Sequence, residues 1–146
     1  MLDKTKIGHQ FQPFTIEVEK GRLKFFAKAI GETNPIYFDE QAAIKAGHKS
    51  ILAPPTFAFT IDLDGPELLP VLKLLDMDIG KVLHGAQEFE YMANIYAGDN
   101  ITVAVSIKDM FDKKGGALEF VVLETRFCNQ DDALVATALN TLVYRN

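Results

Sequence analysis

The second half of the chain is a run of β-strands, and this run constrains the fold more than any other feature. Its clearest strand covers residues 101–107, where apolar residues alternate with small or polar ones. This period of two indicates a strand with one buried face. The other expected strands cover residues 82–92, 117–127 and 133–144, with turns at 97–100, 113–116 and 129–132. Strands joined by such turns form adjacent hairpins, so the expected sheet is antiparallel.

The first half of the chain supplies helices. Leu23, Phe26, Ala27 and Ile30 have the spacing of one apolar helix face, and Gly31 ends that helix. Residues 56–63 are apolar around most of the circumference, which predicts a buried helix. Further elements are expected at residues 11–18 (strand), 40–46 (helix) and 67–75 (helix). One buried helix and four long strands predict an α+β fold, a single sheet curled around that helix. The helix covers one face only, so the other face or an edge strand is expected to contact a second subunit.

Size and charge limit the classes of function. At 146 residues without a linker or repeat, the chain is expected to form one domain, residues 1–146. A net charge of −5 argues against nucleic acid or an anionic membrane as partner. The longest stretch without a charged or strongly polar side chain, roughly 51–61, is shorter than the roughly 20 residues that span a bilayer. The N-terminus lacks a signal-peptide core, and the single Cys128 fits a reducing compartment, so the expected location is cytoplasmic. No phosphate loop or metal-ligand spacing is present, so no cofactor and no metal are expected.

A polar turn around one proline is the first candidate for chemistry. Pro35 fixes its own φ and keeps Asn34 out of the helical region, so the turn holds Glu32 and Tyr37 at defined angles. Asp39 is expected to cap the helix that follows. A carboxylate and a hydrogen-bonding aromatic side chain five residues apart can form half of an active site. The alternative is an ordinary helix-turn-helix connection in which Asn34 satisfies its own backbone.

Four motifs, in one order along nearly the whole chain, resemble the MaoC-like hydratases and dehydratases. They are Gly31-Glu32-Thr33-Asn34-Pro35-Ile36-Tyr37, Ala53-Pro54-Pro55-Thr56-Phe57, His84-Gly85-Ala86-Gln87-Glu88-Phe89-Glu90-Tyr91 and Ala97-Gly98-Asp99. The resemblance is greatest to the branch called the N-terminal MaoC dehydratase domain, which includes subunits of mycobacterial (3R)-hydroxyacyl-carrier-protein dehydratases. It implies a hot-dog fold, in which the sheet wraps around the central helix. It also implies a substrate that is an acyl thioester of CoA or of a carrier protein.

Two residues depart from the family pattern Gly-Asp-x-Asn-Pro-(Ile/Leu)-His. Glu32 stands where the family has its Asp, and Tyr37 stands where it has its His. Tyrosine, with an ordinary pKa near 10, is a poor general base at neutral pH but a capable hydrogen-bond donor. Two hypotheses therefore stay open. Either the chain is a hydro-lyase in which Glu32 is the base while Tyr37 and Asn34 orient water, or it is a non-catalytic, acyl-binding subunit of a heterodimer. The expected assembly is a homodimer or a heterodimer with a related hot-dog subunit.

The remaining candidates surround this motif. His84, on an expected strand, is the best replacement for the missing histidine, and with period two it shares a face with Glu88 and Glu90. The resemblance implies that N–H groups near Gly85, or at the helix start formed by Pro55, Thr56 and Phe57, polarise the thioester carbonyl. The alternatives are a structural histidine and a simple bulge at the glycine.

An acid on the predicted central helix gives a third hypothesis, because hot-dog thioesterases carry one there. Asp62 would then activate water for thioester hydrolysis. Asp64, by contrast, is expected to cap a helical piece that starts at Pro66.

Overall fold

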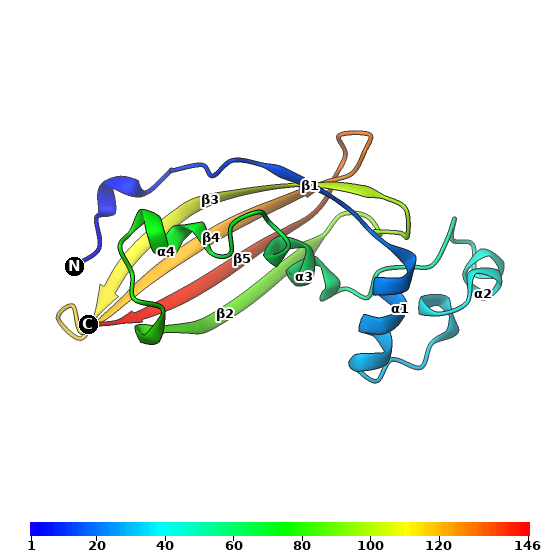
Figure 1. The fold of residues 1–146 in the computed structure, drawn as a ribbon, viewed down its shortest axis with the longest axis horizontal. Coiled ribbons are helices and arrows are strands. Elements are labelled where there is room, and N and C mark those ends of the chain that lie inside the picture. The colour runs from blue at the N-terminus through cyan, green and yellow to red at the C-terminus, as the bar shows by residue number, and fades with distance from the viewer.

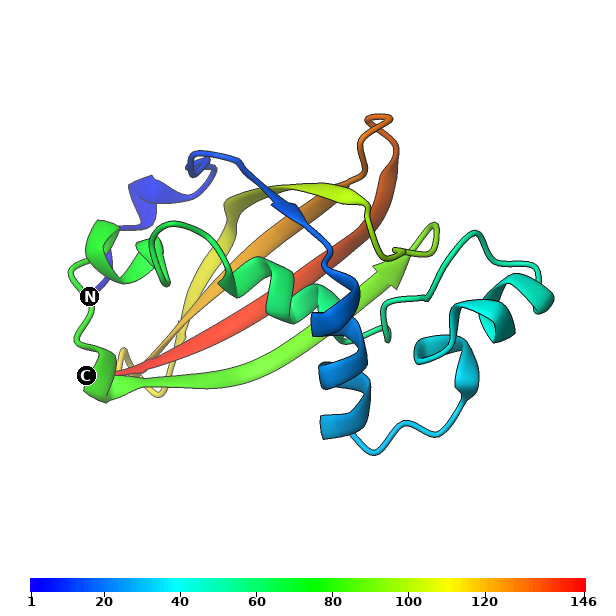
Figure 2. The ribbon, with the colours of Figure 1, turned by 45° about the vertical axis from the view of Figure 1, so that its right-hand side comes forward.

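A single antiparallel sheet packed on a central helix makes up most of the molecule in the computed structural model, which describes residues 1–146 (Figure 1). The strands are β1 Phe14–Glu17, β2 Val82–Tyr91, β3 Asn100–Lys113, β4 Leu118–Cys128 and β5 Leu134–Arg145, in the spatial order β1-β3-β4-β5-β2. The helices are α1 Lys20–Ala29, α2 Glu40–Lys45, α3 Phe57–Leu63 and α4 Pro70–Leu74, with short 3₁₀ turns η1 Lys4–Lys6, η2 Pro35–Tyr37 and η3 Ile79–Lys81. Both views place α3 across one face of the sheet, as the sequence predicted (Figures 1 and 2). None of the helices combines the length and the apolar character needed to cross a bilayer.

The position of β2 differs from the expected hairpin. β3–β4 and β4–β5 pair as hairpins, but β2 pairs with β5 at the far edge of the sheet and not with β3. The connection from β2 to β3 crosses the end of the sheet. Its backbone is fixed there by hydrogen bonds from Met92 and Ala93 to the Val135 carbonyl (2.9 and 3.1 Å). The turn sequence at residues 97–100 correctly predicted that the chain bends before β3. It did not predict that β2 pairs with β5, because that pairing depends on contacts between strands far apart in the sequence.

The core consists of two apolar clusters under the helices. One contains α3 residues such as Ile61 with one end of the sheet, and the other contains α4 with the opposite end. The inward-facing residues of β5 are Ala136, Ala138, Asn140 and Leu142, so a buried polar residue interrupts an apolar row. Thr125 is the buried polar residue in the inward row of β4, between Phe127 and Leu123, and lies diagonally opposite Asn140, since it pairs with Ala138. A thin polar layer therefore separates the two clusters.

Helices α1 and α2 project beyond one end of the sheet, on the right in Figure 1. Gly31, with φ of +74°, ends α1 in the left-handed conformation that glycine adopts without strain. Asp39 caps α2 through Ala42 N–H (3.0 Å), as predicted. Buried Asp99 holds the neighbouring loops together by accepting hydrogen bonds from Lys49 Nζ (2.6 Å), Tyr96 N–H (2.9 Å) and Gln130 Nε2 (3.2 Å). The projecting segment is thus a fixed part of the fold.

The segment after α3 is less helical than expected. The helix predicted over 67–75 begins only at Pro70, because Leu69 has a positive φ (51°) and Pro70 suits the first helical position. Asp64 does not cap a helix at Pro66, so that prediction was wrong. Its carboxylate instead forms an ion pair with Arg22 of α1 (2.6 Å).

Candidate functional site

The Asn-Pro turn fixes the carboxylate of Glu32. The half-buried Glu32 accepts hydrogen bonds at Oε1 from the N–H groups of Thr33 (2.8 Å) and Asn34 (2.9 Å). Its second oxygen makes no hydrogen bond. The Asn34 side chain accepts from the Ile36 N–H (3.2 Å) and so satisfies the backbone of its own turn. The turn therefore presents one oriented carboxylate oxygen, while the oxygen of Asn34 is already engaged.

Tyr37 lines a groove of about 420 Å³ beside this turn. The other walls are residues 52–55, which precede α3, and residues 91–95, which follow β2. The Tyr91 hydroxyl donates to the Pro55 carbonyl (2.8 Å) across the groove, and partial burial raises the pKa of that phenol. Glu32 is not among the lining residues. Tyr37 therefore belongs both to the Asn-Pro turn and to the wall of the groove.

The candidates at the start of α3 have unequal positions. Pro55 lines the groove, and Thr56 is exposed next to it. Phe57 is only 2% exposed, and its ring packs edge-to-face on Phe26 with 5.3 Å between centroids. Phe57 is therefore a core residue that fixes the helix start, and its side chain does not line the groove.

His84 and Gly85 lie near the opposite end of β2 from the groove. Tyr91 lies seven positions after His84 along β2, which corresponds to about 23 Å of strand at about 3.3 Å per residue. The register shifts between His84 and Ala86, so Gly85 occupies a β-bulge. A Cβ on Gly85 would lie 2.7 Å from Val143 Cγ2, which accounts for the glycine. Within one copy of the chain, these two residues do not meet Tyr37.

The bulge also turns His84 to the other face. His84 pairs with the inward-facing Leu142, so it shares a face with Gln87 and not with Glu88 and Glu90, and that part of the prediction was wrong. Its ring packs on Phe59 of α3 (5.6 Å between centroids), and its Nε2 lies 3.3 Å from Gln87 Oε1. A period of two predicts a face only where the strand has no extra residue.

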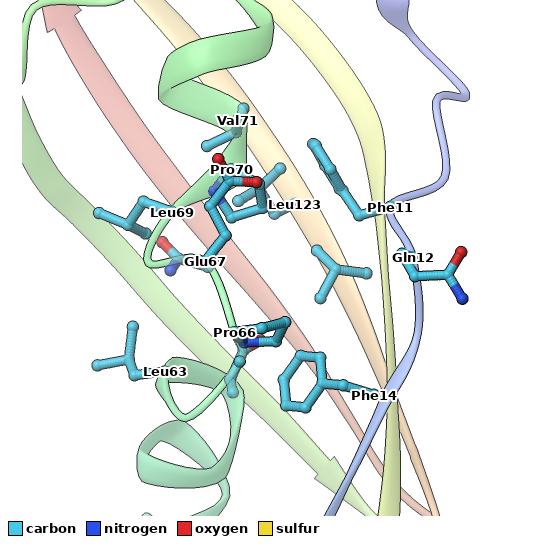
Figure 3. A pocket seen from close by; sticks show the side chains of 14 residues that line it. Phe11, Gln12, Phe14, Leu63, Pro66, Glu67, Leu69, Pro70, Val71 and Leu123 are labelled. Atoms are coloured by element: carbon cyan, nitrogen blue, oxygen red, sulfur yellow. The ribbon is translucent and has the colours of Figure 1, made fainter.

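A second cavity, of about 150 Å³, lies between the α3–α4 segment and the sheet (Figure 3). Asp62 lines it and accepts a hydrogen bond from the Thr125 hydroxyl at Oδ2 (3.1 Å). Burial raises the pKa of Asp62 to about 6, against the smaller opposing effect of that hydrogen bond. Asn140 also lines the cavity. The sequence pattern identified Asp62 as a candidate but did not identify Thr125 or Asn140. Asn140 could have been noticed, because it is a single polar residue in an otherwise apolar row of its strand.

No three His, Cys, Asp or Glu side chains gather closely enough to hold an ion.

Comparison with known proteins gives consistent matches. The family model described as "FAS1-like, dehydratase domain region" matches residues 5–138. A UPF0336 protein of Streptomyces griseus is 34% identical over 145 residues, covering 99% of this chain and 95% of the relative. One of Thermobifida fusca is 30% identical, covering 99% and 94%.

Solved structures show the same fold. A chain of the C-terminally truncated HadBC (3R-hydroxyacyl-ACP dehydratase) complex of Mycobacterium tuberculosis aligns with a TM-score of 0.80 at 25% identity, covering 94% of this chain and 96% of that one. A MaoC-like dehydratase aligns with a TM-score of 0.86 at 21% identity, covering 98% of this chain and 43% of that one. These matches confirm both the predicted hot-dog fold and the resemblance to MaoC-like dehydratases.

Proposed function

Because the chain belongs to the FAS1-like dehydratase-region family, we propose that it is a hydro-lyase subunit that adds water to, or removes it from, an acyl thioester. The thioester is carried by CoA or by a carrier protein. The groove beside Tyr37 holds the substrate against Pro55, just before the start of α3. The observation that carries the proposal is the orientation of the Glu32 carboxylate by two backbone N–H groups.

A fixed carboxylate with one free oxygen suits a general base. During hydration, Glu32 Oε2 takes a proton from water while the water oxygen bonds to C3 of the enoyl group. The electron pair of the double bond moves onto the thioester carbonyl as an enolate. Glu32 then returns the proton to C2 as the carbonyl re-forms. Tyr37 and the free amide nitrogen of Asn34 orient the water by hydrogen bonding.

In this proposal a second hot-dog subunit pairs with the chain through the edge strand β2. This strand is an edge of the sheet, ten residues long, with an unpaired backbone on one side. Antiparallel pairing of two hot-dog chains sets the start of one β2 beside the end of the other. That arrangement brings His84 and Gly85 of one copy toward the groove of the next. It suits a homodimer and a heterodimer equally well.

A specific observation favours a second candidate, an acyl-binding subunit without proton transfer. No histidine lines the groove: His48 hydrogen-bonds the Tyr96 hydroxyl (3.2 Å), and His84 lies at the other end of β2. At the position where the family motif has its histidine, this chain has Tyr37. In that case a related subunit supplies the complete pair of catalytic residues, and this chain shapes the acyl site.

Glu32→Gln separates the two candidates. Crotonyl-CoA hydration by the purified protein is followed as loss of enoyl absorbance, with Glu19→Gln as an exposed control. If Glu32 is the base, the rate falls about 10²- to 10⁴-fold in Glu32→Gln and is unchanged in the control. Undiminished hydration by Glu32→Gln contradicts that role. If the chain is instead an acyl-binding subunit, it is inactive alone and becomes active when a related hot-dog subunit is added. That activity should be the same with the parent chain and with Glu32→Gln. Thiol release that stops in Asp62→Asn would instead indicate hydrolysis.

A further inference from the structure

A network of hydrogen bonds joins the wall of the groove to a histidine outside it. Asn94 lines the groove, and its Nδ2 donates to the Tyr96 hydroxyl (3.3 Å). The same hydroxyl lies 3.2 Å from Nδ1 of the half-buried His48. Tyr96 and His48 do not line the groove, so the amide nitrogen of Asn94 is directed away from it. The other amide atom, Asn94 Oδ1, makes no hydrogen bond within the chain and is left to the groove.

The direction of these hydrogen bonds depends on the single proton of the Tyr96 hydroxyl. A phenol donates one hydrogen bond and accepts others through its oxygen. Since that oxygen accepts from Asn94, its proton is donated to His48 Nδ1, which is an acceptor when the ring carries its proton on Nε2. If His48 Nδ1 were the donor, Tyr96 would donate to Asn94 Oδ1, and the amide nitrogen would turn toward the groove. The acceptor role of His48 therefore decides which atom of Asn94 the groove offers.

The surroundings of Tyr96 hold the network in place. Ala53 N–H donates to the Ile95 carbonyl (2.8 Å), which joins the two walls of the groove. Tyr96 N–H donates to the buried carboxylate of Asp99 (2.9 Å). Lys49 pairs with that carboxylate, and its Nζ lies 5.0 Å from the centre of the Tyr96 ring. The phenol is thus held through its backbone and on one face of its ring.

A ligand group that meets Asn94 Oδ1 has to donate a hydrogen bond, since an amide oxygen only accepts. Phosphates and carboxylates in their ionised forms have no donor to offer. The acyl thioesters of the proposed function do: on CoA and on carrier proteins alike, the sulfur is attached to an arm with a secondary amide close by. We propose that Asn94 Oδ1 accepts the N–H of this amide, and that Tyr96 and His48 are positioning residues that keep the oxygen turned toward the groove. The identity of this ligand rests on the proposed function.

Two matched thioesters test the proposal. One is the butyryl thioester of N-acetylcysteamine, and the other is its ester analogue, in which an oxygen replaces the amide N–H. Their binding to the full chain is measured by calorimetry. One neutral hydrogen bond of ordinary net strength predicts about fivefold tighter binding of the amide. Asn94→Ala should abolish this preference. Asn100→Ala, the same change at an exposed asparagine that does not line the groove, should leave it intact.

Two changes at His48 separate positioning from a purely structural role. In His48→Asn, the side-chain oxygen can accept from the Tyr96 hydroxyl in place of Nδ1, so the preference for the amide should persist. In His48→Leu, the hydroxyl has no such acceptor and is released to donate to Asn94 Oδ1, so the preference should be lost. A purely structural role would weaken the binding of both thioesters alike and leave their ratio unchanged.

Three results would overturn the role of Asn94: equal binding of both thioesters to the parent chain, a preference that survives in Asn94→Ala, or no binding of either compound. A ratio that is the same in His48→Leu and His48→Asn would overturn the positioning role. The measurement needs no turnover, because neither probe has a double bond to hydrate. A chain that prefers the amide but never hydrates crotonyl-CoA, alone or with a related subunit, would refute the hydro-lyase and support amide recognition.

Discussion

Removing the charge of Asp62 should change how the stability of the protein depends on pH. Burial raises the pKa of this carboxyl from 3.8 to about 6 in the folded chain, so the folded state holds a proton that the unfolded chain has already lost. Stability is unaffected below about pH 4, where both states are protonated. It falls as pH rises toward 6, and the loss is complete above that. Since one pKa unit corresponds to about 1.4 kcal/mol, the full loss is about 3 kcal/mol.

Asp62→Asn keeps an oxygen that accepts from the Thr125 hydroxyl but carries no charge. Urea unfolding of both proteins at pH 4 and pH 7.5 gives the free energies of unfolding. The difference between variant and parent should be small at pH 4 and should reach about 3 kcal/mol in favour of the variant at pH 7.5. Asp131→Asn, at an exposed carboxylate, controls for net charge. A stability difference for Asp62→Asn that is the same at both pH values would refute the assignment of a buried, ionised carboxylate at neutral pH.

Three further substitutions are expected to change stability, each measured by urea unfolding. Gly85→Ala should lower it by about 1–3 kcal/mol, because the new methyl group would press on Val143 at the bulge; an unchanged midpoint would argue against the bulge. Asp99→Ala should lower the free energy of unfolding by about 3 kcal/mol or more, because Lys49, the Tyr96 N–H and the Gln130 amide lose their common acceptor. Asp99→Asn should lose less stability than Asp99→Ala, because its amide oxygen still accepts hydrogen bonds; an equal loss in both variants would contradict this. Asn140→Leu should raise it by about 1–3 kcal/mol, since an unpaired amide is removed; destabilisation would show that the amide has a partner in solution.

The elements that depend on near neighbours were predictable from the sequence. The alternation over residues 101–107 and the cap at Asp39 each involve residues a few positions apart, and both occur as expected. Leu23, Phe26 and Ala27 also form the inward face of α1, but Ile30 lies past the end of the helix and is 51% exposed. The family motifs were also readable, because they are linear. They identified the hot-dog fold and the turn that carries Glu32.

The features that depend on distant parts of the chain were not predictable. Only the pairing of β2 with β5 decides that β2 is an edge strand, and only the bulge at Gly85 turns His84 toward α3. The meeting of Asn140 and Gln87 joins positions more than fifty residues apart, through a register that no local pattern encodes. The sequence by itself therefore determined the kinds of elements and their order, because backbone propensity and hydrophobic period act locally. The tertiary structure alone decided which polar side chains share a cavity, because strand register and packing are set by the whole sheet.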